Sequence, residues 1–317
     1  MAHILLTGSS GFIGTRLSGR LRSQGHRVTG LDVRPASQTD VVEDLRDPSC
    51  VARIADRLGA VDVVAHFAAV AGVRRSLVEP DLYFDTNVAG TRHALLLAEA
   101  LGAARVVMAS SSSVYGDVEG PAAEDQPLAP LSPYAESKAA AEELARAWAA
   151  TGAFQVVVLR PFTVYGPGQR SDMFCHQALH RVMAGEALQV WDWQRDFTYV
   201  DDVCRGSAAA ITVPLAERFR TYNLGSGRPV PVREFLATLR RVTRLPVSAS
   251  FGPAGAGEPA MTFADPTRAR AELGLRHPGP FVVGLETQRR SVLATMKPAR
   301  HRGALATAAP SGLTPVG

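Results

Sequence analysis

Tyr134 and Lys138 lie four residues apart in the stretch SPYAESK at 132–138. Positions i and i+4 share one face of a helix, so a phenol and an ammonium with this spacing can reach one site. A positive charge beside a phenol favours the phenolate and lowers the pKa of the phenol. The spacing therefore indicates a tyrosine that can accept a proton in catalysis. Because the same spacing arises by chance in many helices, this prediction depends on the motifs that accompany it.

A glycine-rich stretch near the N-terminus has the pattern of a dinucleotide-binding turn. TGSSGFIG at 7–14 follows an apolar run and opens a helix-period segment. Glycines there allow a tight turn and a close approach of the backbone to a pyrophosphate, and a helix N-terminus offers free N–H groups to phosphates. The alternative is a turn whose glycines serve packing only.

Asp32 ends the second apolar run, where a carboxylate can bind the adenosine ribose of a dinucleotide. Such a carboxylate repels a 2′-phosphate, so the sequence predicts NAD rather than NADP. Arg34, two residues later, is a cation that could instead accommodate that phosphate.

Short apolar runs alternate with helix-period segments through the first half of the chain. The helix-period segments include FIGTRLSGRLRSQG and NVAGTRHALLLAEALG. This alternation predicts an α/β fold with a doubly wound parallel (Rossmann) sheet covered by helices on both faces. The expected strands are HILLTG, HRVTGLD, VDVVAHFAA, RVVMASSS and QVVVLRPF.

The regular alternation ends at about residue 165. We therefore expect residues 1–165 to form mainly the NAD-binding Rossmann domain, with later segments returning to it. Residues 166–297 are expected to form mainly a smaller mixed α/β substrate-binding part, with a cleft between the two. Residues 298–317, rich in Ala, Pro, Gly and Thr, are predicted to be a disordered tail.

The composition argues against several classes of protein. With a net charge of +4 and scattered cations, the 317-residue chain lacks the basic stripe of a nucleic-acid binder. No signal-peptide pattern and no uncharged apolar run of about 18 residues is present, so we expect no membrane span. Cys50, Cys175 and Cys204 are widely spaced, which argues against a disulfide framework or zinc cage and favours the cytoplasm.

Eight motifs in order give the chain, over residues 3–295, a clear family likeness. It resembles the extended short-chain dehydrogenase/reductase family, and within it the NAD-dependent nucleotide-sugar epimerases and dehydratases. The motifs are TGSSGFIG, DLRD at 44–47, HFAAVAGVRRS at 66–76, NVAGT at 87–91, SSSSVYG at 110–116, SPYAESK, RPFTVYGPGQRSDM at 160–173 and RDFTYVDDV at 195–203.

The resemblance implies a set of site residues. The catalytic set is Ser111, Tyr134 and Lys138. The cofactor-binding positions are Gly8, Gly11, Phe12, Ile13, Gly14, Asp32, Asp44, Leu45, Ala68, Ala69, Asn87, Ser110, Tyr134, Lys138, Pro161 and Val164. The substrate-facing positions are Arg74, Ser111, Ser112, Ser113, Tyr134, Thr163, Arg170 and Arg195. The family also implies a homodimer formed by the helices at 87–101 and 134–150.

The resemblance further implies a reaction. Tyr134, as phenolate, takes the proton of a sugar hydroxyl while the hydride of that carbon moves to NAD⁺. Lys138 keeps the phenol acidic and binds the nicotinamide ribose, and Ser111 orients the hydroxyl. The resulting 4-keto sugar turns over and takes the hydride back on its other face, which inverts C4.

Three serines distinguish this chain within the family. The dehydratases carry Asp-Glu where this chain has Ser112 and Ser113, and the decarboxylases carry Glu in place of Ser113. Serines followed downstream by Arg170 most resemble UDP-glucuronate 4-epimerases, in which these groups surround the sugar carboxylate. The substrate is therefore expected to be a UDP-sugar. Two departures fall at the nucleotide end, a shortened turn at 190–194 and the absence of a cation or amide at 254–258.

Other interpretations of the sequence remain open. They are a 4-epimerase of a neutral nucleotide hexose or of another nucleotide sugar, an NADP-linked reductase, and a dinucleotide-sensing regulator, which the intact catalytic set argues against. His176 and His180 have metal-ligand spacing but no third ligand is evident, so no metal is predicted. Of Trp191 and Trp193, one is expected to pack and the other to cover an edge. The pair Asp201-Asp202 is expected to cap a helix.

Overall fold

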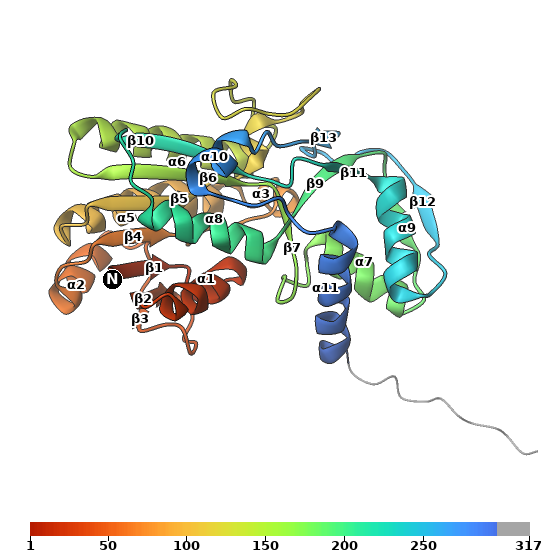
Figure 1. Ribbon diagram of the computed structural model, residues 1–317, viewed down its shortest axis with the longest axis horizontal. Coiled ribbons are helices and arrows are strands. Elements are labelled where there is room, and N and C mark those ends of the chain that lie inside the picture. The colour runs from red at the N-terminus through yellow and green to blue at the C-terminus, as the bar shows by residue number, and fades with distance from the viewer. Residues whose placement is uncertain (297–317) are drawn as a thin grey trace, which may run out of the picture.

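A seven-stranded parallel sheet forms the larger part of the molecule (Figure 1). The computed structural model describes residues 1–296. The strand order is β10-β6-β5-β4-β1-β2-β3, and every neighbouring pair is parallel. The strands are β1 His3–Thr7, β2 Arg27–Asp32, β3 Val41–Val42, β4 Val63–His66, β5 Arg105–Ala109, β6 Gln155–Pro161 and β10 Phe219–Leu224. The Rossmann prediction is confirmed, and the five expected strands are present.

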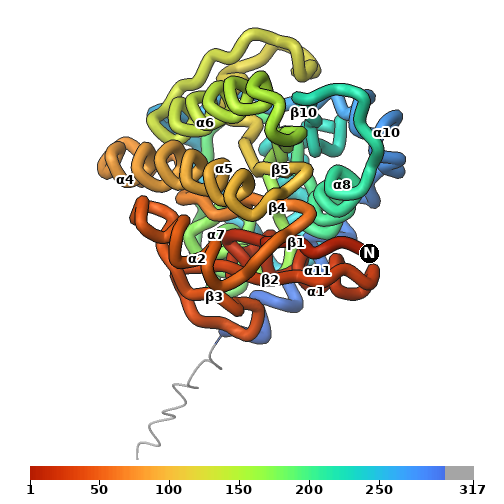
Figure 2. The backbone as a smooth tube through the Cα atoms, turned by 90° about the vertical axis from the view of Figure 1, so that its left-hand side faces the viewer, coloured from red at the N-terminus to blue at the C-terminus, as the bar shows by residue number. Residues whose placement is uncertain are grey.

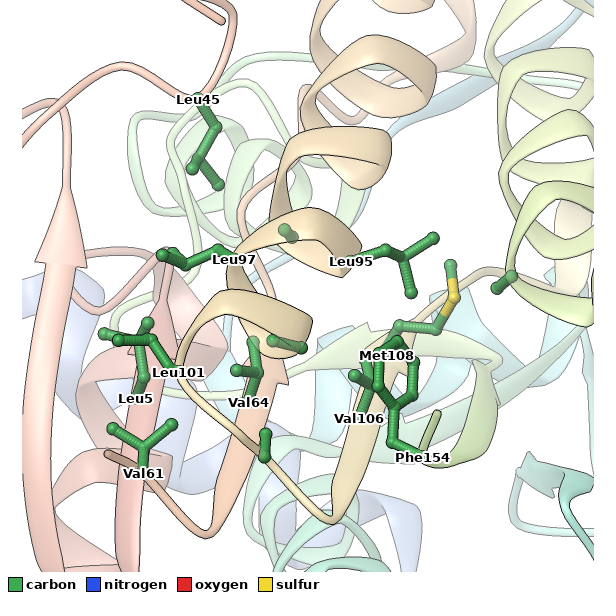
Figure 3. Packing of buried hydrophobic residues seen from close by; sticks show 14 of the residues in the cluster. Leu5, Leu45, Val61, Val64, Leu95, Leu97, Leu101, Val106, Met108 and Phe154 are labelled. Atoms are coloured by element: carbon green, nitrogen blue, oxygen red, sulfur yellow. The ribbon is translucent and has the colours of Figure 1, made fainter. Parts of the chain in front are cut away.

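Helices cover both faces of this sheet (Figure 2). Successive side chains of a strand point to opposite faces, so Leu5 packs with Val64 and Leu95 while Ile4 and Leu6 belong to the core on the other side. Figure 3 shows Leu95, Leu97 and Leu101 lying against the first of these faces. The helices on this face are α2 Cys50–Leu58, α5 Gly90–Ala100 and α6 Pro133–Thr151, and those on the other are α1 Phe12–Ser23, α8 Val200–Thr212 and α10 Thr267–Leu273.

Short helical segments connect these layers near the ends of the strands. A π-helix precedes α5, and a 3-10 turn follows β5. The segments are α3 Val73–Ser76, α4 Pro80–Phe84, the π-helix η1 Asp85–Ala89 and the 3-10 helix η2 Ser112–Tyr115.

A second lobe is built from later segments and from β7, which leaves the sheet directly after β6 (Figure 1). Its strands form one sheet with β9 at its centre, paired to β7, β11 and β13, and a pair β8–β12. The elements are β7 Thr163–Tyr165, α7 Phe174–Met183, β8 Leu188–Val190, β9 Gln194–Tyr199, β11 Pro229–Pro231, α9 Val232–Thr243, β12 Ala249–Phe251, β13 Met261–Thr262 and α11 Phe281–Thr295. The domain boundary near residue 165 stays a prediction.

Aromatic rings fill the core of this lobe. Trp193 is buried, with its ring centroid 5.3 Å from that of Phe174 and 5.6 Å from that of Phe235. Trp191 is only partly buried and faces the guanidinium of Arg74, 5.9 Å from its ring centroid. Trp193 is thus the packing residue of the pair.

The expectation that Asp201 and Asp202 cap a helix is wrong, because they lie inside the helix and not at its N-cap. Helix α8 begins at Val200 with Tyr199 before it, so both carboxylates lie in the first turn. There they complement the positive end of the helix dipole and pair with arginines, Asp201 with Arg16.

The structure describes residues 1–296 only, which limits what it says of two other expectations. The predicted tail at 298–317 lies outside these residues. Within residues 1–296, no helix is long and apolar enough to cross a membrane, and no three His, Cys, Asp or Glu side chains gather as a metal site.

Candidate active site

The turn between β1 and α1 leaves no room for a side chain at Gly8 or Gly14. Gly8 has φ +70°, and a Cβ there would meet the backbone N of Ala68 at 2.6 Å. A Cβ on Gly14 would lie 2.0 Å from the carbonyl O of Gly8. Gly11 is the N-cap of α1 and makes no side-chain cap, so the first N–H groups of the helix stay available to an anion. This turn lies beside β1 and β4, where the strand order reverses and parallel sheets bind their ligands.

The carboxylate of Asp32 is fixed at the edge of this turn. One oxygen accepts a hydrogen bond from the backbone N of Ser10 at 3.0 Å, and the other accepts from that of Arg34 at 3.1 Å. The Arg34 guanidinium is mostly exposed and lies 3.7 Å from the Asp32 carboxylate. Asp44 and Leu45, the predicted adenine contacts, differ in exposure. Asp44 lines an open hollow, whereas the side chain of Leu45 is buried in the core.

Asn87 ties together the loop that follows β4 and helix α6. It lies in the π-helix, is fully buried, and donates to Ser137 Oγ at 2.9 Å and to the carbonyl O of Val70 at 3.0 Å. Its own oxygen accepts from the backbone N of Val70 at 2.9 Å. One-turn π-helices are frequent at functional sites, and this one fixes the path of the loop that contains Ala68 and Ala69.

Local sequence sets where α6 begins and so where Tyr134 and Lys138 lie. Ser132 is the N-cap, and its Oγ accepts from the backbone N of Ala135 at 3.3 Å. Pro133 occupies the first helical position, where its missing N–H removes no hydrogen bond. Tyr134 and Lys138 therefore occupy the first two turns, and the Lys138 Nζ donates to the carbonyl O of Ala109 at 2.9 Å.

The serines follow β5 and reach the same place. The hydroxyl of Ser111 lies close enough to that of Tyr134 to act against the rise in the pKa of the phenol. Ser113 Oγ donates to Ser111 Oγ at 2.9 Å, which leaves the proton of Ser111 free for another acceptor. Ser112 is buried beside them. Ser111, Tyr134 and Lys138 are thus brought together at the carboxyl end of the central strands.

The positions predicted to face the substrate fall into different environments. Arg170 holds the carboxylate of Asp172, and Arg74 faces Trp191. Arg195 is buried, donates to the carbonyls of Pro259 and Ala260 at 2.6 and 3.1 Å, and so supports the backbone at 259–260. Pro161, Thr163 and Val164 lie where the chain crosses from β6 to β7.

Comparison with protein families places the chain. The model of the NAD dependent epimerase/dehydratase family matches residues 4–225. The chain belongs to this family. UDP-glucuronate 4-epimerase of Thermodesulfobacterium geofontis is 30% identical over 85% of this chain and 90% of its own length.

Solved structures of similar proteins agree with the family. MoeE5 in complex with UDP-glucuronic acid and NAD is 36% identical, with a TM-score of 0.86 over 93% of this chain and 100% of that one. UDP-glucuronic acid 4-epimerase from Bacillus cereus in complex with UDP-glucuronic acid and NAD is 28% identical, with a TM-score of 0.85 over 92% and 99% of the two chains.

As a member of an NAD-dependent family, this epimerase/dehydratase homologue uses NAD, and its residues fit that cofactor. At Gly8 and Gly14 the turn has room only for backbone, which fits the close approach of a pyrophosphate. Ser10 Oγ in that turn and Ser110 Oγ after β5 are buried without a hydrogen-bond partner among the described residues. Buried polar groups are normally paired, so these two hydroxyls fit a polar ligand along this edge.

The electrostatics around Tyr134 differ from the expectation based on spacing. Burial raises the pKa of Tyr134, and the opposing effects come from the Ser111 hydrogen bond and the charge of Arg170. Burial also lowers the pKa of Lys138 to about 8, partly opposed by the carboxylate of Glu142. The expected lowering of the phenol pKa by Lys138 is thus not found, because the Lys138 ammonium is desolvated and directed to the carbonyl O of Ala109.

Sequence reasoning missed a buried ion pair next to this set. Glu142 and Arg160 are both buried, and Arg160 Nη2 donates to the Glu142 carboxylate at 2.6 Å. Glu142 lies four residues after Lys138, as Lys138 does after Tyr134, so helical spacing was a signal that could have found it.

A contact between helix α1 and the second lobe was also missed. Arg16 on α1 donates through Nε and Nη2 to the carbonyl O of Pro167, at 3.2 and 3.0 Å, and through Nη1 to Asp201 at 2.9 Å. Nothing in the local sequence indicates it, because the partners are 151 and 185 residues away.

Proposed function

We propose that the protein is an NAD-dependent nucleotide-sugar 4-epimerase that interconverts UDP-glucuronate and UDP-galacturonate. The observation that carries the proposal is the position of Tyr134 in the first turn of α6, beside Ser111 and Arg170, with Lys138 one turn later bonded to the end of β5. The similarity to UDP-glucuronate 4-epimerases supports the substrate.

Tyr134 is the proton acceptor in this proposal. It takes the proton of the C4 hydroxyl as C4 is oxidised, and returns it when C4 is reduced on the other face. Bound NAD supplies the hydride acceptor and then the hydride donor. Ser111 orients the sugar oxygen, since Ser113 already donates to its Oγ and leaves its own proton to be donated.

Retention of the sugar carboxylate follows from the neutral groups beside Ser111. A 4-keto sugar with a C5 carboxylate is a β-keto acid and can lose CO₂ after oxidation. Ser112 offers a hydroxyl donor to the carboxylate, since the proton of Ser113 is already donated to Ser111. Near pH 7 neither serine can act as the acid or base that decarboxylation or water elimination would use. The expected product is therefore a 4-epimer, with little pentose formed.

A neutral UDP-hexose is the second candidate substrate. Arg170 already forms an ion pair with Asp172, with two distances of 2.9 Å, so its charge is partly compensated before any substrate binds. In this alternative Arg170 contacts the diphosphate and has no role in selecting an acidic sugar.

The first experiment incubates the purified protein with a panel of nucleotide sugars and follows the products by NMR. The proposal expects interconversion of UDP-glucuronate and UDP-galacturonate without net consumption of NAD. Faster turnover of UDP-glucose than of UDP-glucuronate by the wild-type protein would reject the proposed substrate.

A second experiment compares Arg170→Ala with Arg75→Ala, a nearby arginine that pairs with Glu79. Hydrogen bonds to charged groups contribute about 1.5–3 kcal/mol, so Arg170→Ala should lower kcat/KM for UDP-glucuronate by about 10- to 100-fold. The loss on UDP-glucose should be much smaller. Equal losses on the two substrates would support the neutral alternative, and Arg75→Ala should change neither.

We also propose that the protein is a cytoplasmic homodimer whose subunits meet through α5 and α6. The surface beside α6 supports this, because α4 packs against that helix and Leu77, Val78 and Phe84 on this side are exposed apolar residues. The three cysteines are buried and free, as in proteins of a reducing compartment.

A further inference from the structure

Arg170 has few N–H groups left for a ligand. Its Nε and Nη2 donate to the two oxygens of Asp172, each at 2.9 Å, and Nη2 also donates to the carbonyl O of Ala71 at 3.0 Å. Nη2 also contacts Met173 Sδ at 3.6 Å. Nε and Nη2 together have three N–H groups, and these acceptors occupy all three, so only the two N–H groups of Nη1 remain for a ligand. A substrate carboxylate that is to be held by two parallel hydrogen bonds must therefore displace one of them.

The Asp172 carboxylate can leave Arg170 at little cost. The Asp172 side chain is 64% exposed and that of Arg170 is 44% exposed, so the carboxylate can move into water without leaving a buried charge behind. The two residues are joined by a turn in which the backbone N of Met173 donates to the carbonyl O of Arg170 at 3.1 Å. The turn keeps Asp172 near Arg170 whether or not the side chains are paired.

We propose that Asp172 is a specificity-determining residue that competes with an acidic sugar for Arg170 and so weakens the preference for carboxylate-bearing over neutral nucleotide sugars. The proposal rests on the proposed function, in which Arg170 meets the sugar. If Asp172 leaves on binding, the ion pair is lost. If it stays, its charge repels the substrate carboxylate. Both cases disfavour the acidic sugar.

The same pair acts on the proton acceptor. The positive charge of Arg170 lowers the pKa of Tyr134, whereas burial raises it. The carboxylate of Asp172 cancels part of that positive charge. Removing the carboxylate should therefore offset more of the rise in the pKa of Tyr134 that burial causes, and should move the acidic limb of the pH–rate profile to lower pH on both substrates.

The test uses Asp172→Asn, which keeps the shape and removes the charge. Exposed ion pairs contribute about 0.2–1 kcal/mol, so the ratio of kcat/KM for UDP-glucuronate to that for UDP-glucose should rise by up to about fivefold. The dissociation constants of the two nucleotide sugars, measured by calorimetry, should shift in the same direction.

Two control variants isolate the effect. Glu79→Gln removes the same charge from a similar exposed pair, in which Arg75 donates to Glu79 at 3.0 and 2.9 Å, and it should leave the ratio unchanged. In an Arg170→Ala background, Asp172→Asn should have no further effect, as expected for residues that act through one pair.

The outcomes separate this proposal from the proposed function. A ratio that stays constant or falls in Asp172→Asn, or that rises equally without Arg170, overturns the role of Asp172. A wild-type protein that binds both nucleotide sugars but epimerises neither overturns the proposed function, and the dissociation constants still test Asp172. Failure to bind either nucleotide sugar overturns both.

Discussion

Replacing Lys138 with methionine should stabilise the nucleotide-free protein while abolishing catalysis. Lys138 is 4% exposed, and burial lowers its pKa from 10.5 to about 8. One pKa unit is worth about 1.4 kcal/mol, so the charged ammonium destabilises the folded protein by roughly 3 kcal/mol at neutral pH. The variant also loses the hydrogen bond from Nζ to Ala109, worth about 1 kcal/mol. The net gain in the free energy of unfolding is about 2 kcal/mol.

The stability gained by Lys138→Met depends on pH. The folded protein releases the Lys138 proton near pH 8, whereas the unfolded chain keeps it to about pH 10.5. Between these values the unfolded state binds more protons, so the stability of the wild-type protein rises with pH relative to the variant. The advantage of Lys138→Met is therefore complete below pH 8 and is lost as the pH approaches 10.5.

Urea unfolding of both proteins at pH 7 and at pH 10, after removal of bound nucleotide, measures this difference. Lys138→Arg serves as a control, because a guanidinium cannot release its proton in this pH range. It should therefore be less stable than Lys138→Met at both pH values. A Lys138→Met variant that is less stable than wild type at pH 7, or a difference that does not change with pH, would refute the reasoning.

Three other outcomes are expected. Tyr134→Phe should keep the fold and NAD binding but lower turnover by about 10²–10⁴, and near-wild-type turnover would exclude the phenol as proton acceptor. Calorimetry should show tighter binding of NAD than of NADP because of the Asp32 carboxylate, and the reverse order would point to Arg34. Light scattering at micromolar concentration should show a dimer, and a monomer would contradict the pairing through α5 and α6.

The sequence predicted those strands whose side chains are buried on both faces. Runs such as VDVVAHFAA are continuously apolar because helices cover both sides of the sheet. Strand β10, FRTYNL, lies at the edge and carries polar side chains, so no apolar run indicated it. Its buried Asn223 bonds to Tyr115, 108 residues earlier, and such pairing cannot be seen in a local pattern.

The candidate site shows the same division. The residue types and their order along the chain came from motifs, and the fold brings Ser111 to Tyr134 as the motifs imply. The charges acting on these side chains depend on burial and on distant partners. The opposite shift of the Tyr134 pKa and the use of Arg195 to support residues 259–260 therefore required the structure.

The place of β9 in the second lobe limits how this protein can acquire new substrates. Its partners β7, β11 and β13 come from three separate parts of the chain, and Asp196 within it accepts backbone hydrogen bonds from Ser226, Gly227 and Ala264. Between β9 and β11 the chain returns to the large sheet as β10. No continuous segment therefore encodes this lobe, so exchange of one segment by recombination cannot replace it as a unit. In such a fold, a change of specificity is expected to come from point substitutions within a fixed scaffold.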